Sequence, residues 1–237
     1  MLACCVMISY TTHALTGFGG IIIAVTLASH LYPIGMLLPI LVPLDILVNS
    51  YIVARRHAHI DRSILFREIV PFMLIGLVIG IAIFSYTRAA ELQKVFGLFV
   101  LFLSVRELYR LLKNTPTVGL SRVTSTGYMI AAGVVQGVYA SGGPLLVYAV
   151  SGFNLPKSVF RSTLSALWLI TNIMLVTSYS VTGKVTWESV EYFLILLPIV
   201  IGAIITGEKL HGLVNERVFK IVVFLILIVA GLSIVIL

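Results

Sequence analysis

The sequence predicts an all-helical integral membrane protein with about eight transmembrane helices. Hydrophobic residues make up 59% of its 237 residues and charged residues only 11%, and the mean hydropathy of +1.11 is far above that of soluble domains. Apolar runs of about 20 residues recur along the chain, each long enough to cross a hydrocarbon core of roughly 30 Å. The alternating pattern of a membrane β-barrel is absent from the sequence. Little of the chain is left for a soluble domain.

Polar residues divide the chain into its expected spans. These cover residues 3–29, 33–53, 68–86, 92–112, 124–151, 158–180, 188–206 and 217–237. The two cysteines, Cys4 and Cys5, are adjacent, which is too close for an ordinary disulfide, and they are too few for a metal site. We therefore assign them no function.

The net charge of +7 comes from Lys and Arg gathered in short loops between spans. In a membrane protein such loops are topology signals and contacts for lipid headgroups, so we expect a lipid bilayer and no nucleic acid as partner. The strongest basic loops lie at residues 55–67 and 106–122. Placing both in the cytoplasm puts both termini there as well. Lys209, Arg217 and Lys220 would then lie outside the cytoplasm, against the rule that basic loops face the cytoplasm.

An internal repeat appears when the chain is shifted by 123 residues. The shift superposes Gly19-Gly20 on Gly142-Gly143, Pro33 on Pro156, Asn49 on Asn172 and Val95-Phe96 on Val218-Phe219. This predicts a first four-helix repeat at 1–113 and a second at 124–237, joined by a loop at 114–123. An even number of spans in each repeat makes the two repeats parallel.

Two glycine-rich segments interrupt the first and fifth spans at corresponding positions. They contain Gly19 and Gly20 in one span, and Ser141, Gly142, Gly143 and Pro144 in the other. Glycine permits non-helical dihedrals and proline suits the first turn of a new helix, so both spans are expected to be broken. A helix that starts inside the membrane offers free amides to an anion. The alternative is that these small residues serve close helix packing.

A polar stripe runs along the sixth span. Arg161, Ser165, Trp168 and Asn172 share one helical face, and such a face should meet protein or a cavity rather than lipid. Arg161 could neutralise a bound anion beside Pro144 through two hydrogen bonds. Alternatively it snorkels to the headgroups.

The same offset of 123 residues makes Asp45 equivalent to Trp168, and Asn49 equivalent to Asn172. Asp45 is the acidic residue that lies well inside an expected span. A charge is costly there, which favours a function such as proton coupling or pairing with Arg161. A structural hydrogen bond from a neutral acid is the alternative.

Motifs for catalysis are missing from the sequence. It contains neither a His-Glu-x-x-His motif nor a phosphate-binding loop. His57 and His59 lack further ligands at metal-site spacing, and a serine protease built on Ser141 would need a histidine in one of the last three spans. We expect no enzyme activity, no metal and no cofactor.

Several stretches resemble the TauE/SafE sulfite exporter family over nearly the whole chain. They are Thr16 to Gly20, His59-Ile60-Asp61, Gln136 to Val147 and Phe160 to Leu164. The resemblance implies a multi-pass transporter of the bacterial inner membrane that exports small inorganic or organosulfur anions such as sulfite. The resemblance also implies that the two glycine-rich motifs are functional, and that Arg161 is functional as well.

The sequence thus predicts an anion exporter that works by alternating access between two repeats. We expect the anion between Ser141 to Pro144 and Arg161, with Ser165 on the same face and the amides of Asn49 and Asn172 nearby; Asp45 is the proton-coupling candidate. A non-transporting receptor or interaction protein and a passive anion channel are the alternatives. Whether the first span crosses fully or turns back at Gly19-Gly20 is open, as is the oligomeric state.

Overall fold

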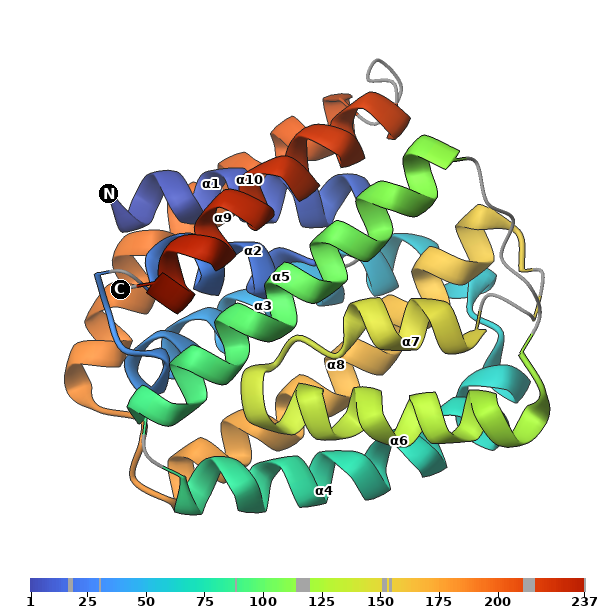
Figure 1. Cartoon of the computed structure of the whole chain (residues 1–237), viewed down its shortest axis with the longest axis horizontal. Helices are drawn as coiled ribbons and strands as arrows, with labels where there is room; N and C mark the ends of the chain where they lie inside the picture. Colours follow the sequence, from blue (N-terminus) through green and yellow to red (C-terminus); the bar gives the residue numbers. More distant parts are fainter. Residues whose placement is uncertain are drawn as a thin grey trace.

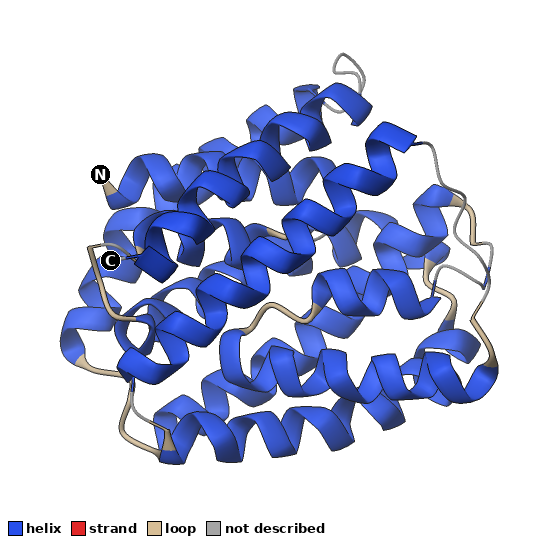
Figure 2. Ribbon diagram, in the orientation of Figure 1, coloured by secondary structure: helices blue, strands red, loops and turns tan. Residues whose placement is uncertain are grey.

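The structure is a computed structural model of the chain. It describes residues 1–16, 19–29, 31–87, 89–113, 120–150, 153, 155–210 and 216–236. These residues form helices joined by short loops and contain no strand (Figure 2). Gly17 and Phe18, which belong to the segment from Thr16 to Gly20, lie outside the described residues.

The helices follow the expected order, with the glycine-rich segments as interruptions. The first half contains α1 (Leu2–Thr16), α2 (Gly20–Ala28), α3 (Ile34–Arg56), η1 (His57–His59), η2 (Ile64–Ile69), α4 (Val70–Tyr86) and α5 (Ala89–Lys113). The second contains α6 (Arg122–Tyr139), α7 (Gly143–Val150), α8 (Lys157–Val181), α9 (Trp187–Leu210) and α10 (Glu216–Ile236). In the part of the chain described, four helices are long and apolar enough to cross a membrane, at 34–59, 64–86, 158–181 and 187–210.

The first and fifth expected spans do not cross the molecule, because each folds back on itself as a helical hairpin. Helices α1 and α2 pack against each other, and so do α6 and α7. The hydroxyl of Ser125, near the start of α6, donates to the carbonyl of Ala149, near the end of α7, at 2.8 Å. The expected breaks in both spans are thus present, and the chain reverses direction between α6 and α7. The open question about the first span is answered in the same way, since α2 returns alongside α1 (Figure 1).

Helices that pair between the two halves run in opposite directions. Asp45 of α3 lies beside Asn172 of α8, while Asp61, after α3, lies beside Thr163 near the start of α8. Helix α5 meets α10 in the same antiparallel sense, since Gly97 faces Ile234 and Gly231 faces Leu101. Parallel repeats would pair these helices in the same direction, so the parallel arrangement is wrong. The physical reason is the hairpins, because each returns the chain toward the end of the molecule at which the hairpin began.

The termini and the basic loops lie at opposite ends of the molecule. Figure 1 shows both termini at one end, where α9 also begins. The other end collects the ends of α3, α5 and α9 and the starts of α6, α8 and α10. These helix ends carry most of the basic residues, Arg55, Arg56, Arg110, Lys113, Arg122 and Lys209 among them. The structure therefore separates the termini from the basic helix ends, which the sequence was expected to place on one side.

Helices α4 and α6 cross with their backbones in contact. A Cβ on Gly80 would overlap the carbonyl of Val134, and one on Gly137 would overlap the carbonyl of Leu77. Small residues allow this approach, which replaces the hydrophobic driving force that is missing between helices in lipid. The contact joins a helix of the first half to the hairpin of the second, as α9 joins the hairpin α1–α2.

Replacing Gly137 with alanine should destabilise the protein. The added methyl group must displace the α4 backbone, and overpacking of this kind costs about 1–3 kcal/mol. Thermal unfolding of the purified protein in detergent measures the effect. Gly127→Ala is the matched control, because a Cβ at Gly127 of the same helix meets nothing within 4 Å. An equal loss of stability in both variants would contradict the close α4–α6 crossing.

Candidate anion site between two hairpin tips

The tip of each hairpin is shaped by a residue in the left-handed region. Gly19, with φ of 87°, precedes α2 in the first hairpin. Ala140, with φ of 51°, ends α6 in the second. A left-handed conformation costs a non-glycine residue roughly 1–2 kcal/mol, so the surrounding contacts must hold Ala140 in place. Among them, the hydroxyl of Ser141 donates to the carbonyl of Tyr139 at 2.8 Å.

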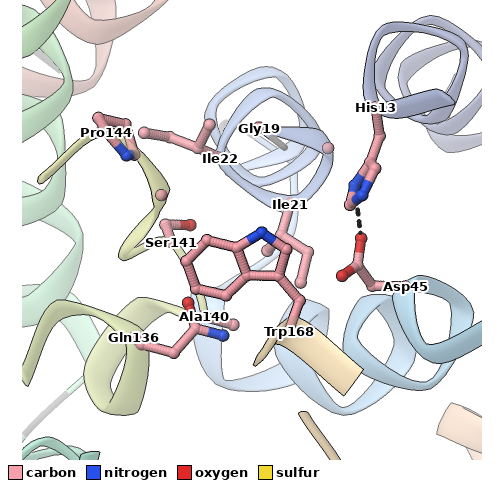
Figure 3. A pocket seen from close by; sticks show the side chains of 12 residues that line it. His13, Gly19, Ile21, Ile22, Asp45, Gln136, Ala140, Ser141, Pro144 and Trp168 are labelled. Carbon is pink, nitrogen blue, oxygen red and sulfur yellow. Dashed lines mark ion pairs between the residues drawn. The ribbon is translucent and has the colours of Figure 1, made fainter. Parts of the chain in front are cut away.

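A small cavity lies between the two hairpin tips (Figure 3). Its volume is about 20 Å³, which holds a water molecule but not a four-atom oxyanion, since one water needs roughly 10–15 Å³. Its lining residues are His13, Gly19, Gly20, Ile21, Ile22, Asp45, Gln136, Ala140, Ser141, Gly143, Pro144 and Trp168. The first turns of α2 and α7 thus both border one space, and helix starts carry partial positive charge.

Asp45 is the centre of a buried polar cluster beside this cavity. Its Oδ1 lies 2.9 Å from Nδ1 of His13, a contact that brings the two groups together without the alignment of a hydrogen bond. Its Oδ2 accepts from Nδ2 of Asn49 at 2.7 Å and from Nδ2 of Asn172 at 2.8 Å. All four side chains are buried. The partners supply the stabilisation that a buried carboxylate needs.

The cluster continues to the tip of the second hairpin. The side-chain oxygen of Asn172 accepts from Nε2 of Gln136 at 2.9 Å. The Oε1 of Gln136 in turn accepts from the backbone N–H of Gly142 at 3.0 Å. Because each amide donates on one side and accepts on the other, the orientations of both amides are mutually consistent. A continuous path of hydrogen bonds therefore joins Asp45 to the turn that precedes α7.

Arg161 occupies a different place from the one expected. Its Nη2 donates to the carbonyl of Ala14, in the last turn of α1, and lies 3.1 Å from Oε1 of Glu208 on α9. A cation at the carbonyl end of a helix is favourable, so Arg161 stabilises the end of α1. It is not among the cavity-lining residues. The arginine is buried rather than snorkelling, with its side chain 6% exposed.

The structure brings together only part of the expected site. Gly19, Gly20, Asp45, Ser141, Gly143 and Pro144 line the cavity. Asn49, Asn172 and Gly142 lie one contact behind it, where their donors are engaged by Asp45 and Gln136. Arg161 and Ser165 lie further along α8 and do not line it.

His13, Gln136 and Trp168 are cavity residues that the sequence analysis did not place in the site. The shift of 123 residues contains a signal for them, because it superposes His13 on Gln136 and Asp45 on Trp168. Four pairs of lining residues are thus equivalent between the two halves: His13 and Gln136, Gly20 and Gly143, Ile21 and Pro144, and Asp45 and Trp168. Trp168 adds a donor: within the described residues, its buried indole Nε1 has no hydrogen-bond partner.

The chain matches, over residues 1–234, a protein-family model described as sulfite exporter TauE/SafE. The chain belongs to the TauE/SafE family. No curated protein and no solved structure matches it. TauE/SafE proteins are membrane transporters and not enzymes, which agrees with the apolar helices of this chain.

Proposed function

We propose that this TauE/SafE protein exports a small oxyanion, sulfite or an organosulfonate, and binds it at the cavity between the hairpin tips. The observation that carries the proposal is the convergence of two helix starts, α2 and α7, on one buried space. The indole N–H of Trp168, buried and without a partner among the described residues, is a further donor there. Aligned amides and a neutral donor suit a small anion that leaves most of its water behind.

Movement of the two hairpins would open this site. A cavity of about 20 Å³ has to widen before a four-atom oxyanion fits, which is expected of an occluded stage in alternating access. The antiparallel pairs α3–α8 and α5–α10 support two inverted repeats, 1–113 and 124–237, related by an axis in the membrane plane. Inverted repeats supply two equivalent routes from one central site, one to each side.

Asp45 and His13 are the groups that we propose for proton coupling. They meet at 2.9 Å beside the anion cavity, and both line it. Proton uptake by this pair removes a negative charge next to the anion. Ionisable groups inside a membrane protein commonly form proton relays, and this one is joined through Asn172 and Gln136 to the turn before α7.

The basic end of the molecule is proposed to face the cytoplasm. Most Lys and Arg residues belong to helix ends on that side, whereas Lys94 and Lys184 lie at the other. With the hairpins folded back, Lys209 joins the remaining basic residues, so the conflict with the positive-inside rule disappears. Both termini then lie outside the cytoplasm.

Trp168→Phe should weaken anion binding while the aromatic ring remains. Loss of one hydrogen bond to a charged ligand should raise the KM for sulfite about tenfold, measured as uptake into vesicles that contain the purified protein. The matched control is Trp187→Phe, because Trp187 is 75% exposed and is not among the residues that line the cavity. An unchanged KM in Trp168→Phe would argue against this cavity. Wild-type vesicles that carry no anion at all would favour the non-transporting alternative.

Asp45→Asn should uncouple transport from the proton gradient. The amide keeps the size of the carboxyl group but cannot take up the proton, so downhill sulfite flux should persist while a pH gradient no longer drives accumulation. Vesicle uptake with and without an imposed gradient measures this, with Glu188→Gln at an exposed acidic residue as control. Wild-type flux that ignores the gradient would indicate a passive channel and no coupling role for Asp45.

A reporter fused to the C-terminus should be active if it works only outside the cytoplasm, as alkaline phosphatase does. A fluorescent protein that works only inside the cytoplasm should stay dark at the same position. The reason is the basic end, which should stay in the cytoplasm and leave the termini outside. Paired fusions to alkaline phosphatase and to a fluorescent protein measure this in intact bacteria. Fluorescence without phosphatase activity would reverse the proposed orientation.

A further inference from the structure

Buried polar groups continue from the cavity along α8 toward the basic end of the molecule. Trp168 lines the cavity, Ser165 lies one turn nearer the start of α8, and Arg161 lies one turn beyond Ser165. The three share a helical face. Within the described residues, Oγ of Ser165 and both Nε and Nη1 of Arg161 are buried without a hydrogen-bond partner. Donors left without partners cost stability, so these buried groups beside the cavity-lining Trp168 call for an occupant.

Contacts of Arg161 close this stretch at the basic end. The guanidinium holds the carbonyl of Ala14, whose neighbour His13 lines the cavity, and it pairs with Glu208. Gly207 lies against Ala14, where a Cβ would collide, so α9 approaches α1 closely enough to deliver Glu208. The side chain of Glu208 is 32% exposed, whereas that of Arg161 is 6% exposed. The carboxylate is thus the outer partner and the cation the inner one.

We propose that Arg161 is a second anion-binding station, on the access route between the basic end and the central cavity, and that Glu208 occupies it in the closed state. The proposal rests on the proposed anion transport. A small oxyanion arriving from the basic end replaces the Glu208 carboxylate on the guanidinium, which offers a planar set of donors. From there it passes Ser165 and reaches Trp168 and the two helix starts.

The station belongs to one side of the molecule only. The shift of 123 residues places Leu38 of α3 at the position of Arg161, and Leu38 is fully buried in the apolar core. The equivalent route to the terminal end therefore has no cation at this position. This asymmetry gives the basic end an attraction for anions that the other end lacks.

Cysteine labelling tests the route without depending on transport. Ser165→Cys is made in a protein whose own cysteines are replaced, Cys4→Ala and Cys5→Ala, and is placed in sealed vesicles of known orientation. The probe is 2-sulfonatoethyl methanethiosulfonate, a small anionic thiol reagent. In the Glu208→Gln background the labelling rate from the basic end should rise about tenfold. The loss of this partly exposed ion pair should have an effect between the effects of losing an exposed pair and a buried pair. Added sulfite should slow the labelling.

A control on the same helix separates an opened route from a loosened fold. Thr171→Cys replaces a fully buried residue whose hydroxyl donates to the carbonyl of Leu167 of its own helix, at 3.1 Å. It should stay unlabelled whether or not the Glu208→Gln substitution is present. Three results would each overturn the proposal: equal labelling of Ser165→Cys with and without Glu208→Gln, labelling only from the terminal end, or labelling of Thr171→Cys as well.

A second measurement needs no introduced cysteine. In Glu208→Gln, the KM for sulfite presented at the basic end should fall, while the KM at the terminal end stays unchanged. If the ion pair is purely structural, its loss alters the KM at both ends alike. That result would contradict an anion-binding station at Arg161. Wild-type protein without sulfite flux would instead remove the proposed function, and the labelling pattern would still report whether Glu208 closes this route.

Discussion

The burial of one carboxylate is the constraint around which this fold is organised. Asp45 lies inside a helix that is apolar on almost every other face, and a charge in such surroundings is costly unless it is paired and hydrogen-bonded. Its partners come from α1, from its own helix α3 and from α8. The side chains that satisfy it therefore also fix how three helices meet at the middle of the molecule. Gln136 extends the same requirement to α6 and to the turn after it.

The hairpin tips can exist at membrane depth because this cluster and the neighbouring helices surround them. Backbone that leaves a helix inside a membrane is tolerated only when it is buried in protein or lines a cavity. Gly142 meets this condition through the side chain of Gln136, and the last turn of α1 meets it through Arg161. Two side chains that the sequence suggested as substrate ligands, Arg161 and Ser141, thus serve to satisfy the interrupted backbone. What remains free for a ligand at the cavity, among the described residues, is smaller: two helix starts, an indole N–H and the Asp45–His13 pair.

The sequence contained the helices, the two interruptions and the family, because each depends on local composition or on a motif. It did not contain the direction of the chain after an interruption. Gly19-Gly20 and Ser141 to Pro144 permit either a kink or a reversal, and only packing, such as the Ser125–Ala149 hydrogen bond, decides between them. That one ambiguity accounts for the wrong repeat symmetry and for the expectation that the termini lie beside the basic loops. Likewise, the sequence shows that Arg161 and Trp168 share a helical face. It does not show that Arg161 pairs with Glu208, because Glu208 belongs to α9, which is distant in sequence.

The close crossing of α4 with α6 has a consequence for the units that the proposed transport would move. Gly76 and Gly80 of the first half contact Gly133 and Gly137 of the second with backbone against backbone, and α1 packs in the same way against α9. Each hairpin is thus held against a helix from the opposite half of the chain. In the proposed transport cycle the rigid bodies are therefore interleaved rather than consecutive, and neither half of the polypeptide carries a complete one. A boundary drawn between residues 113 and 124 divides the expected repeats in the sequence but separates each hairpin from the helix against which it packs.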